Sequence, residues 1–242
     1  MTPDTPTRRR ILGALGSVGL LYVGVDRGRA ALGLTPVETN QQMQIETAGP
    51  MPDVALDWPE TLNGEVQEDT DLGSVTAGNT GDVGLVVDES VVPGDEGTLT
   101  MRATLVDGGE TAAETAALFL RFLLSNTAEN GVSEPEEKAG DDPTSDEGEL
   151  QNFTEVTIWK DTGIGTGNGS QEPFEDVIAD GTLSSIEGQV GDGHRLHDGC
   201  LSVGDSVYVS LRWRVPSDAG NIIQGDSAAF AVGFDPRACE SQ

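Results

Sequence analysis

Lysine, histidine and aromatic residues are all scarce in this chain. Lysine occurs only as Lys138 and Lys160, histidine only as His194 and His197, and aromatic residues make up 5% of the 242 positions. The 42 acidic residues outnumber the 13 basic ones, which gives a formal net charge of -29. Such a charge opposes binding to nucleic acid or to an anionic membrane surface. Neither histidine lies in a recognisable triad context, so serine or cysteine hydrolase chemistry has no visible basis.

The acidic composition is compatible with disorder or with a folded protein that has an acidic surface. A hydrophobic fraction of 36% and recurring strand-like stretches argue against disorder. A folded chain with so few lysines is typical of a halophile, in which molar salt screens the self-repulsion over a few ångströms. A calcium-rich or generic acidic secreted protein is the alternative.

The N-terminal segment has the pattern of an export signal. Arg8, Arg9 and a third arginine precede an apolar stretch of about fifteen residues, which is shorter than a membrane span of roughly 20 residues and fits a signal peptide. The arginine pair resembles a twin-arginine motif and also fits the charged region of an ordinary signal. Gly28 and Ala30 place small residues before a cleavage site. We predict a signal peptide over 1–30, a leader or linker over 31–50 and one domain over 51–242, with retention of the first segment as an anchor as the alternative.

Cysteine is also rare, because the chain contains only Cys200 and Cys239. In an exported chain an even count predicts a disulfide, and two unpaired thiols are the alternative. The bridge would close a loop of about 39 residues and contribute roughly 4 kcal/mol in the chain-entropy description.

Alternating apolar residues predict a series of strands along the domain. They lie within residues 53–62, 82–92, 96–108, 152–161, 205–216 and 227–235. Glycine-rich turns separate them, as in antiparallel sandwiches. The sequence therefore predicts an all-β protein, an antiparallel jelly-roll-like β-sandwich with long acidic loops.

Three segments have no single clear pattern. Residues 110–126 fit a helix by their alanine stripe and near absence of β-branched residues, and they fit a buried strand equally well through Leu118, Leu120 and Phe122. Residues 127–149 are expected to form a long acidic loop, and residues 174–188 a short helix or turn.

Metal ligands are hard to identify in so acidic a chain. His194 and His197, with Asp192 and Asp198 beside them, have a spacing that could bind a metal on a helix, but the surrounding glycines favour a loop. The glycine-rich span 161–176 offers oxygen ligands for calcium, although charged loops of this kind are commonly only solvated. The weak calcium candidates are Asp161, Asn168, Glu172 and Asp176.

No catalytic residue and no other cofactor is predicted. The zincin motif HExxH is absent, and the carboxylate pairs are too numerous for any one pair to indicate glycosidase chemistry. Two sequons, Asn152 in NFT and Asn168 in NGS, permit N-glycosylation in an exported protein.

Residues 213–239 read WRVPSDAGNIIQGDSAAFAVGFDPRAC and combine a tryptophan near a strand end, a polar turn and an alternating strand that stops close to a cysteine. This region resembles haloarchaeal proteins of the TasA and camelysin type. In those proteins a strand that ends in Trp-x-x-Pro is followed by a Gly-Asn-x-x-Gln-x-Asp-Ser turn and a Phe-containing strand that closes at a cysteine. Weaker matches in the same order extend the resemblance over roughly residues 54–239. The matching C-terminal residues are Trp213, Pro216, Gly220, Asn221, Gln224, Asp226, Ser227, Phe230, Phe234 and Cys239.

The resemblance implies an exported β-sandwich of jelly-roll type, in a family of which some members form extracellular fibres. Assembly in such fibres is similar to donor-strand exchange, in which the N-terminal strand of one subunit completes the sheet of the next. The resemblance also favours a strand at residues 117–125. Camelysins carry a metalloprotease label, for which this chain shows no protease motif.

We therefore expect a non-enzymatic exported protein of the cell surface or extracellular matrix that self-associates into filaments or a matrix. No nucleic-acid partner is expected, and a membrane would be contacted only through an uncleaved N-terminal segment. A calcium- or glycan-binding surface module is the alternative hypothesis, and a camelysin-like metalloprotease is a third.

Overall fold

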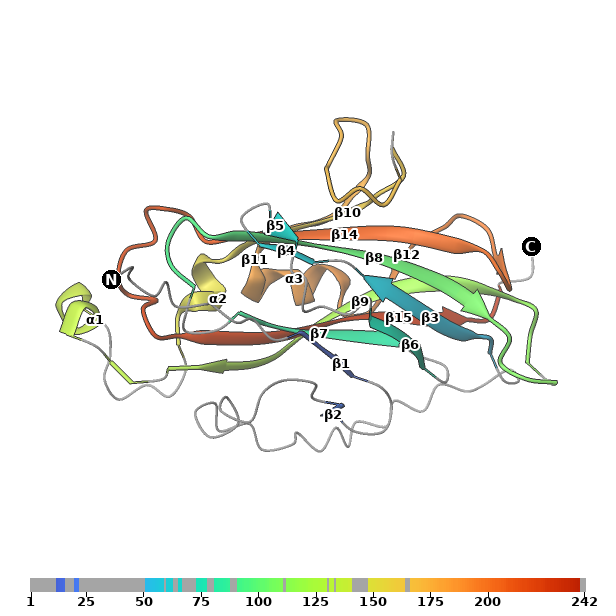
Figure 1. Ribbon diagram of the computed structural model, residues 1–242, viewed down its shortest axis with the longest axis horizontal. Coiled ribbons are helices and arrows are strands. Elements are labelled where there is room, and N and C mark those ends of the chain that lie inside the picture. The colour runs from blue at the N-terminus through green and yellow to red at the C-terminus, as the bar shows by residue number, and fades with distance from the viewer. Residues whose placement is uncertain are drawn as a thin grey trace, which may run out of the picture.

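Two antiparallel β-sheets form the body of the protein, with the short helices α1 (Glu134–Ala139) and α2 (Leu150–Phe153) toward one end and α3 (Leu183–Val190) near the middle (Figure 1). The computed structural model describes residues 51–58, 91–110, 112–129, 131–132, 134–140, 148–163 and 166–239, and the backbone of the strands at 12–15, 20–21, 60–62, 65–66, 73–77 and 81–87. The predicted antiparallel sandwich is confirmed as a mainly β fold with two antiparallel sheets. The predicted signal and leader, apart from the strands at 12–15 and 20–21, lie outside the described residues.

The first sheet has the strand order β12-β9-β15-β7-β1-β2, and β13 also pairs with β9. β15 is the central strand, paired with β9 on one side and with β7 on the other. The strands are β1 (Leu12–Leu15), β2 (Leu20–Leu21), β7 (Gly81–Val87), β9 (Thr115–Ala128), β12 (His194–Arg195), β13 (Leu201–Ser202) and β15 (Ser227–Arg237).

The second sheet has the order β11-β10-β14-β8-β3-β6, and β4 pairs with both β8 and β5. Its centre is the β14–β8 ladder, which runs without interruption from Ser206↔Thr104 to Arg214↔Glu96. The strands are β3 (Asp53–Trp58), β4 (Glu60–Leu62), β5 (Glu65–Val66), β6 (Gly73–Ala77), β8 (Glu96–Val106), β10 (Glu155–Lys160), β11 (Val177–Thr182) and β14 (Ser206–Arg214).

The core lies between the sheets and is built from alternate residues of the long strands. This alternation follows from the two-residue period of a strand, which sends successive side chains to opposite faces. Phe122 of β9 stacks on Phe230 of β15 with ring centroids 5.1 Å apart. The predicted inward faces are confirmed for β8, β14 and β15. Their buried residues include Leu99, Met101, Ala103, Leu105, Val209, Leu211, Trp213, Phe230, Val232 and Phe234.

Helix α3 (Leu183–Val190) closes the space between the sheets on one side. It contacts β9 of the first sheet and β11 of the second, and its apolar face, Leu183, Ile186 and Val190, is buried. The outer edge of β11 is covered in part by Gln189, whose side-chain amide accepts from the N–H of Asp180 at 3.4 Å and donates to its carbonyl at 3.1 Å. An exposed sheet edge is commonly blunted by such a cover.

The segments with no clear sequence pattern resolve into regular elements. Residues 115–128 form strand β9, because eleven positions from Ala117 to Ala128 pair with β15 and this pairing outweighs the helical propensity of Ala and Leu. The expected acidic loop contains helix α1 (Glu134–Ala139) and leads into α2 (Leu150–Phe153). Residues 174–188 contain strand β11 and most of helix α3 rather than a lone helix or turn.

Candidate functional site

The edge of the first sheet is completed by a strand from the far N-terminal segment. β1 runs antiparallel to β7, from Leu12↔Leu85 to Leu15↔Asp82, and lies in the lower layer of Figure 1 beside β7. β1 falls inside the predicted signal peptide. The sheet position next to β7 therefore accepts a strand from the segment that is predicted to be a signal peptide.

The glycine-rich span that offered calcium ligands is a loop anchored by Asp161. This residue is fully buried, and its carboxylate accepts hydrogen bonds from the N–H groups of Gly167 and Gly169 and from the hydroxyl of Ser210, all at 2.8 Å. Ser210 Oγ also lies within hydrogen-bond distance of Thr100 Oγ1, at 3.0 Å, and is the acceptor there because its single proton is donated to Asp161. These contacts tie the loop to the two central strands of the second sheet, and they occupy both oxygens of Asp161.

The other calcium candidates of this loop, Asn168, Glu172 and Asp176, form hydrogen bonds within the loop and to the end of β10. The Asn168 side chain donates to Glu172 Oε1 at 3.2 Å, so these two lie together. Asp176 is exposed, and its backbone carbonyl accepts the N–H of Lys160 at 2.9 Å. Glu175 is the second buried carboxylate of the span after Asp161, and it accepts from the N–H groups of Gly163 and Glu172 at 2.7 and 2.9 Å. The loop is thus organised by carboxylates that receive backbone hydrogen bonds.

Neither histidine lies on a helix: His194 is part of the short strand β12, where the surrounding glycines favoured a turn, and His197 lies in the loop that follows. His194 belongs to β12 and is half-buried, and burial is the main cause that lowers its pKa, followed by the charge of Lys160. His197 is exposed, and its Nδ1 accepts the N–H of Gly199 at 3.0 Å. Asn152, on α2, and Asn168 are both exposed, so glycosylation at either sequon stays a prediction.

The predicted disulfide between Cys200 and Cys239 is confirmed, with Cα atoms 6.0 Å apart. Cys239 follows β15, and Cys200 precedes β13, which pairs with β9. The bridge thus fastens the end of the central strand to the edge of the same sheet.

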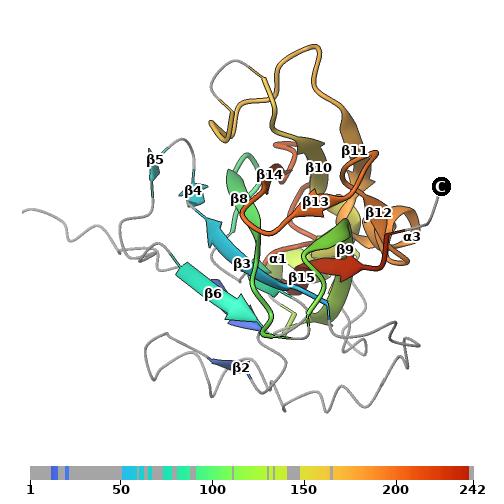
Figure 2. The same cartoon turned by 90° about the vertical axis from the view of Figure 1, so that its right-hand side faces the viewer.

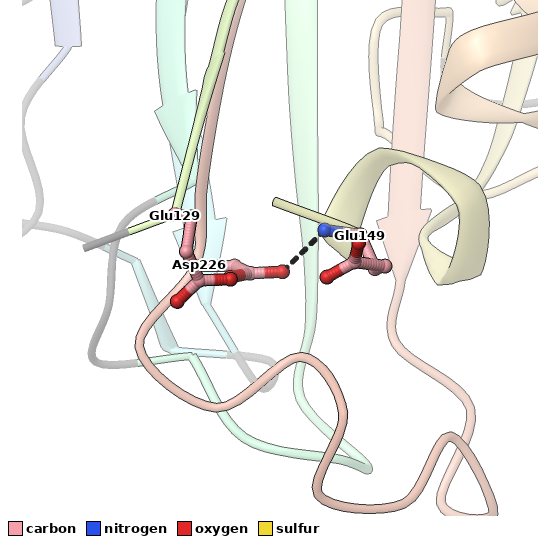
Figure 3. A group of neighbouring side chains, drawn as sticks. All are labelled: Glu129, Glu149 and Asp226. Atoms are coloured by element: carbon pink, nitrogen blue, oxygen red, sulfur yellow. Dashed lines mark hydrogen bonds between the residues drawn. The ribbon is translucent and has the colours of Figure 1, made fainter. Parts of the chain in front are cut away.

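A cluster of three carboxylates that the sequence did not single out lies at the opposite end of β15. Glu129 follows β9, Glu149 precedes α2 and Asp226 precedes β15. One carboxylate oxygen from each lies within 4.8 Å of the others, and the three side chains converge in Figure 3. Among the residues that the structure describes, this is the only group of three or more potential metal-ligand side chains gathered so closely.

Asp226 is the best-defined member of this acidic cluster, which we define as Glu129, Glu149 and Asp226. It is 1% exposed, and its Oδ2 accepts the N–H groups of Glu149 at 2.5 Å and Leu150 at 3.0 Å. Its carboxylate therefore satisfies backbone donors at the start of α2. Within the described part of the chain, its second oxygen, Oδ1, is buried and receives no hydrogen bond from an N–H or hydroxyl group.

The surroundings of Asp226 disfavour its negative charge. Burial raises its pKa, and the charge of Glu136 raises it further, whereas hydrogen bonds from the Glu149 and Leu150 backbone and from Glu129 lower it. Two carboxylates about 4.8 Å apart repel by roughly 3 to 4 kcal/mol at an effective dielectric constant of about 20. Closely placed acids of this kind are stable when they share a proton or bind a cation.

The cluster has no local signature in the sequence, because its members are 20 and 77 residues apart in a chain with 42 acidic residues. The positions of the three residues are the one clue in the sequence. Glu129 and Glu149 lie near the two ends of the expected acidic loop at residues 127–149, and Asp226 belongs to the C-terminal turn that carries the resemblance to TasA and camelysin. The pairing of β9 with β15 brings Glu129 and Asp226 together, and the turn before α2 adds Glu149.

No helix in the described residues is both long enough and apolar enough to span a membrane. Comparisons of the chain with protein-family models, with curated proteins and with solved structures find no match. The resemblance to TasA and camelysin therefore stays a prediction.

Proposed function

We propose that this chain is an exported, non-enzymatic structural protein of the cell surface or extracellular matrix of a halophile, and that it self-associates into filaments by strand complementation. The pairing of β1 with β7 carries this proposal. A strand that is added to a sheet edge gains affinity from main-chain hydrogen bonds, whatever chain supplies it.

Removal of the predicted signal peptide would take β1 away from β7. The main-chain groups of residues 82–85, which pair with β1, would then be open to another strand. In the proposed filament, residues 31–50 of a neighbouring subunit supply that strand. An extended segment of this length reaches up to roughly 66 Å, which is enough to cross from one subunit to the next.

Three further features support an exported structural role. The Cys200–Cys239 disulfide is of the kind that persists in oxidising compartments. The net charge of -29 fits a surface that works in molar salt. The two-sheet sandwich is the architecture that the resemblance implies.

Negative-stain microscopy of residues 31–242 in high salt tests the proposal, with residues 51–242 as the matched variant that lacks the donor segment. We expect filaments from the longer chain and monomers from the shorter one. A synthetic peptide of residues 10–17, which contains β1, should bind the mature chain and stop polymerisation, whereas a scrambled peptide should not. A longer chain that stays monomeric at every concentration would contradict the filament model.

The same preparation separates the alternatives. A camelysin-like metalloprotease requires stoichiometric zinc and casein cleavage, so we expect neither. A glycan-binding module would bind to a glycan array as a monomer. Glycan binding by a protein that forms no polymer would favour the binding hypothesis over the structural one.

A further inference from the structure

We propose that Glu129, Glu149 and Asp226 bind one calcium ion. The ion would hold the end of β9 and the start of α2, which carry Glu129 and Glu149, against the start of β15. The proposal goes beyond the structural role of the chain and does not depend on filament formation, because it concerns a site within one subunit.

The strand register fixes two of the ligands opposite each other. Ser227 pairs with Ala128 at the end of the β15–β9 ladder, so one further step places Asp226 across from Glu129. Like charges directly opposite each other destabilise a sheet. A cation bound between the two carboxylates attracts both of them, so their arrangement becomes stabilising.

The third ligand is brought in by a turn that wraps tightly over Asp226. A Cβ atom on Gly148 would lie 2.6 Å from Cγ of Asp226 and 2.8 Å from the carbonyl oxygen of Ala128, so the turn requires glycine at this position. The turn places the backbone N–H of Glu149 on Asp226 Oδ2 and the Glu149 side chain beside the other two carboxylates (Figure 3).

The buried oxygen Oδ1 of Asp226 is the atom that most clearly indicates a bound cation. It belongs to a side chain that is 1% exposed, and among the described residues it receives no hydrogen bond from an N–H or hydroxyl group. A buried carboxylate oxygen left without a donor is costly. A bound cation would supply the missing contact.

The ligand atoms select calcium by their chemistry. All are oxygens, which are the ligands of hard cations rather than of zinc or copper. Two oxygens on one calcium ion can lie up to about 5 Å apart, since each bond is about 2.3–2.6 Å, and the cluster stays within 4.8 Å. Magnesium ordinarily keeps several waters, which suits a site buried around Asp226 less well.

Calcium binding to the purified full chain, stripped with EDTA and dialysed into concentrated KCl, tests the proposal by calorimetry and thermal unfolding. We expect one ion per chain and a rise in Tm of about 5 to 10 °C at a hundredfold excess over Kd. Glu129→Gln and Glu149→Gln should each raise Kd at least about tenfold, since even indirect partners of metal ligands have effects of that size. Asp226→Asn should do the same if it folds.

Two matched carboxylates provide the controls. Glu134 is an exposed residue of α1 in the same acidic segment, paired with Lys138, and Glu172 belongs to the loop at 161–176. Glu134→Gln and Glu172→Gln should leave Kd within about twofold of the wild type.

The order of the melting temperatures of wild type and Glu129→Gln, with and without calcium, distinguishes a calcium site from an acidic surface that binds no ion. In EDTA, Glu129→Gln should melt above the wild type because one repelling charge is gone, and in excess calcium it should melt below it. The absence of a calcium-dependent heat and Tm shift would overturn the proposal. So would equal weakening by Glu134→Gln or Glu172→Gln, or an equal Tm shift with magnesium at the same concentration.

Discussion

The indole of Trp213 lies over Gly97, its direct partner in the β14–β8 ladder. A Cβ atom at position 97 would come within 2.6 Å of the indole Nε1 and 2.7 Å of Cε2. Because Trp213 is buried and 4% exposed, the ring has little room to move away. The absence of a side chain at Gly97 is therefore what lets the tryptophan pack flat on the sheet.

Gly97→Ala should lower the free energy of unfolding by about 1 to 3 kcal/mol, the usual effect of overpacking a core. Urea unfolding followed by tryptophan fluorescence measures the change. Gly188→Ala is the matched control, because this glycine lies within α3 and a Cβ atom there meets nothing within 4 Å. It should stabilise the protein by roughly 0.5 to 1 kcal/mol. Equal stability of Gly97→Ala and the wild type would contradict the packing.

Asp161→Ala should destabilise the protein by about 2 to 4 kcal/mol, because it leaves the N–H groups of Gly167 and Gly169 without their acceptor. Limited proteolysis should then cut the loop at 162–176 faster. Asp176→Ala, in the same loop but exposed, should change stability by less than about 0.5 kcal/mol. An Asp161→Ala protein as stable as this control would show that Asp161 does not anchor the loop.

Removal of the disulfide should cost about 4 kcal/mol of unfolding free energy, since the bridge closes a loop of 39 residues in the unfolded chain. Guanidinium unfolding of the Cys200→Ser/Cys239→Ser variant measures it. Dithiothreitol should destabilise the wild type by a similar amount and leave the double variant unchanged. A reductant effect on the double variant would point to a cause other than the bridge.

The pH dependence of stability should contain a contribution from His194. Its pKa is lowered in the folded protein, first by burial and then by the charge of Lys160, so the unfolded chain binds a proton more readily. The stability that neutral His194 contributes is complete above its ordinary pKa of 6.5 and is lost as the pH falls through the folded pKa.

Unfolding free energies of the wild type and of His194→Gln, measured from pH 7.5 down to pH 5, test this. The advantage of the wild type over the variant should shrink as the pH falls. His197→Gln replaces the chain's other histidine, which is exposed, and serves as the control. A difference between wild type and His194→Gln that does not vary with pH would contradict the prediction.

The strands and their inward faces could be predicted from the sequence, because large apolar residues alternate in β8, β14 and the middle of β15. The outward faces of β8 and β14 are only partly buried, whereas β15, the central strand of its sheet, is buried on both faces. β9 could not be assigned from its own residues. Its Ala and Leu content suits a helix, and only its long pairing with β15 makes it a strand.

The candidate sites were harder to predict because acidic residues have several physical roles. Asp161 looks like a calcium ligand in the sequence, yet in the structure it accepts backbone hydrogen bonds. Asp226 looks like part of a turn, yet it faces two other carboxylates. The difference depends on which donors and charges the fold brings near each carboxylate, and no local pattern in the sequence records that.

The disulfide at the end of β15 also has a mechanical consequence. A pull on any strand added beside β7 would pass in shear through the β7–β15 ladder and then through the longer β15–β9 ladder. Because Cys239 is bonded to Cys200, the end of β15 next to Cys239 cannot peel away one residue at a time. Rupture there requires many backbone hydrogen bonds to break together, so the sheet resists tension much more strongly along its strands than across them.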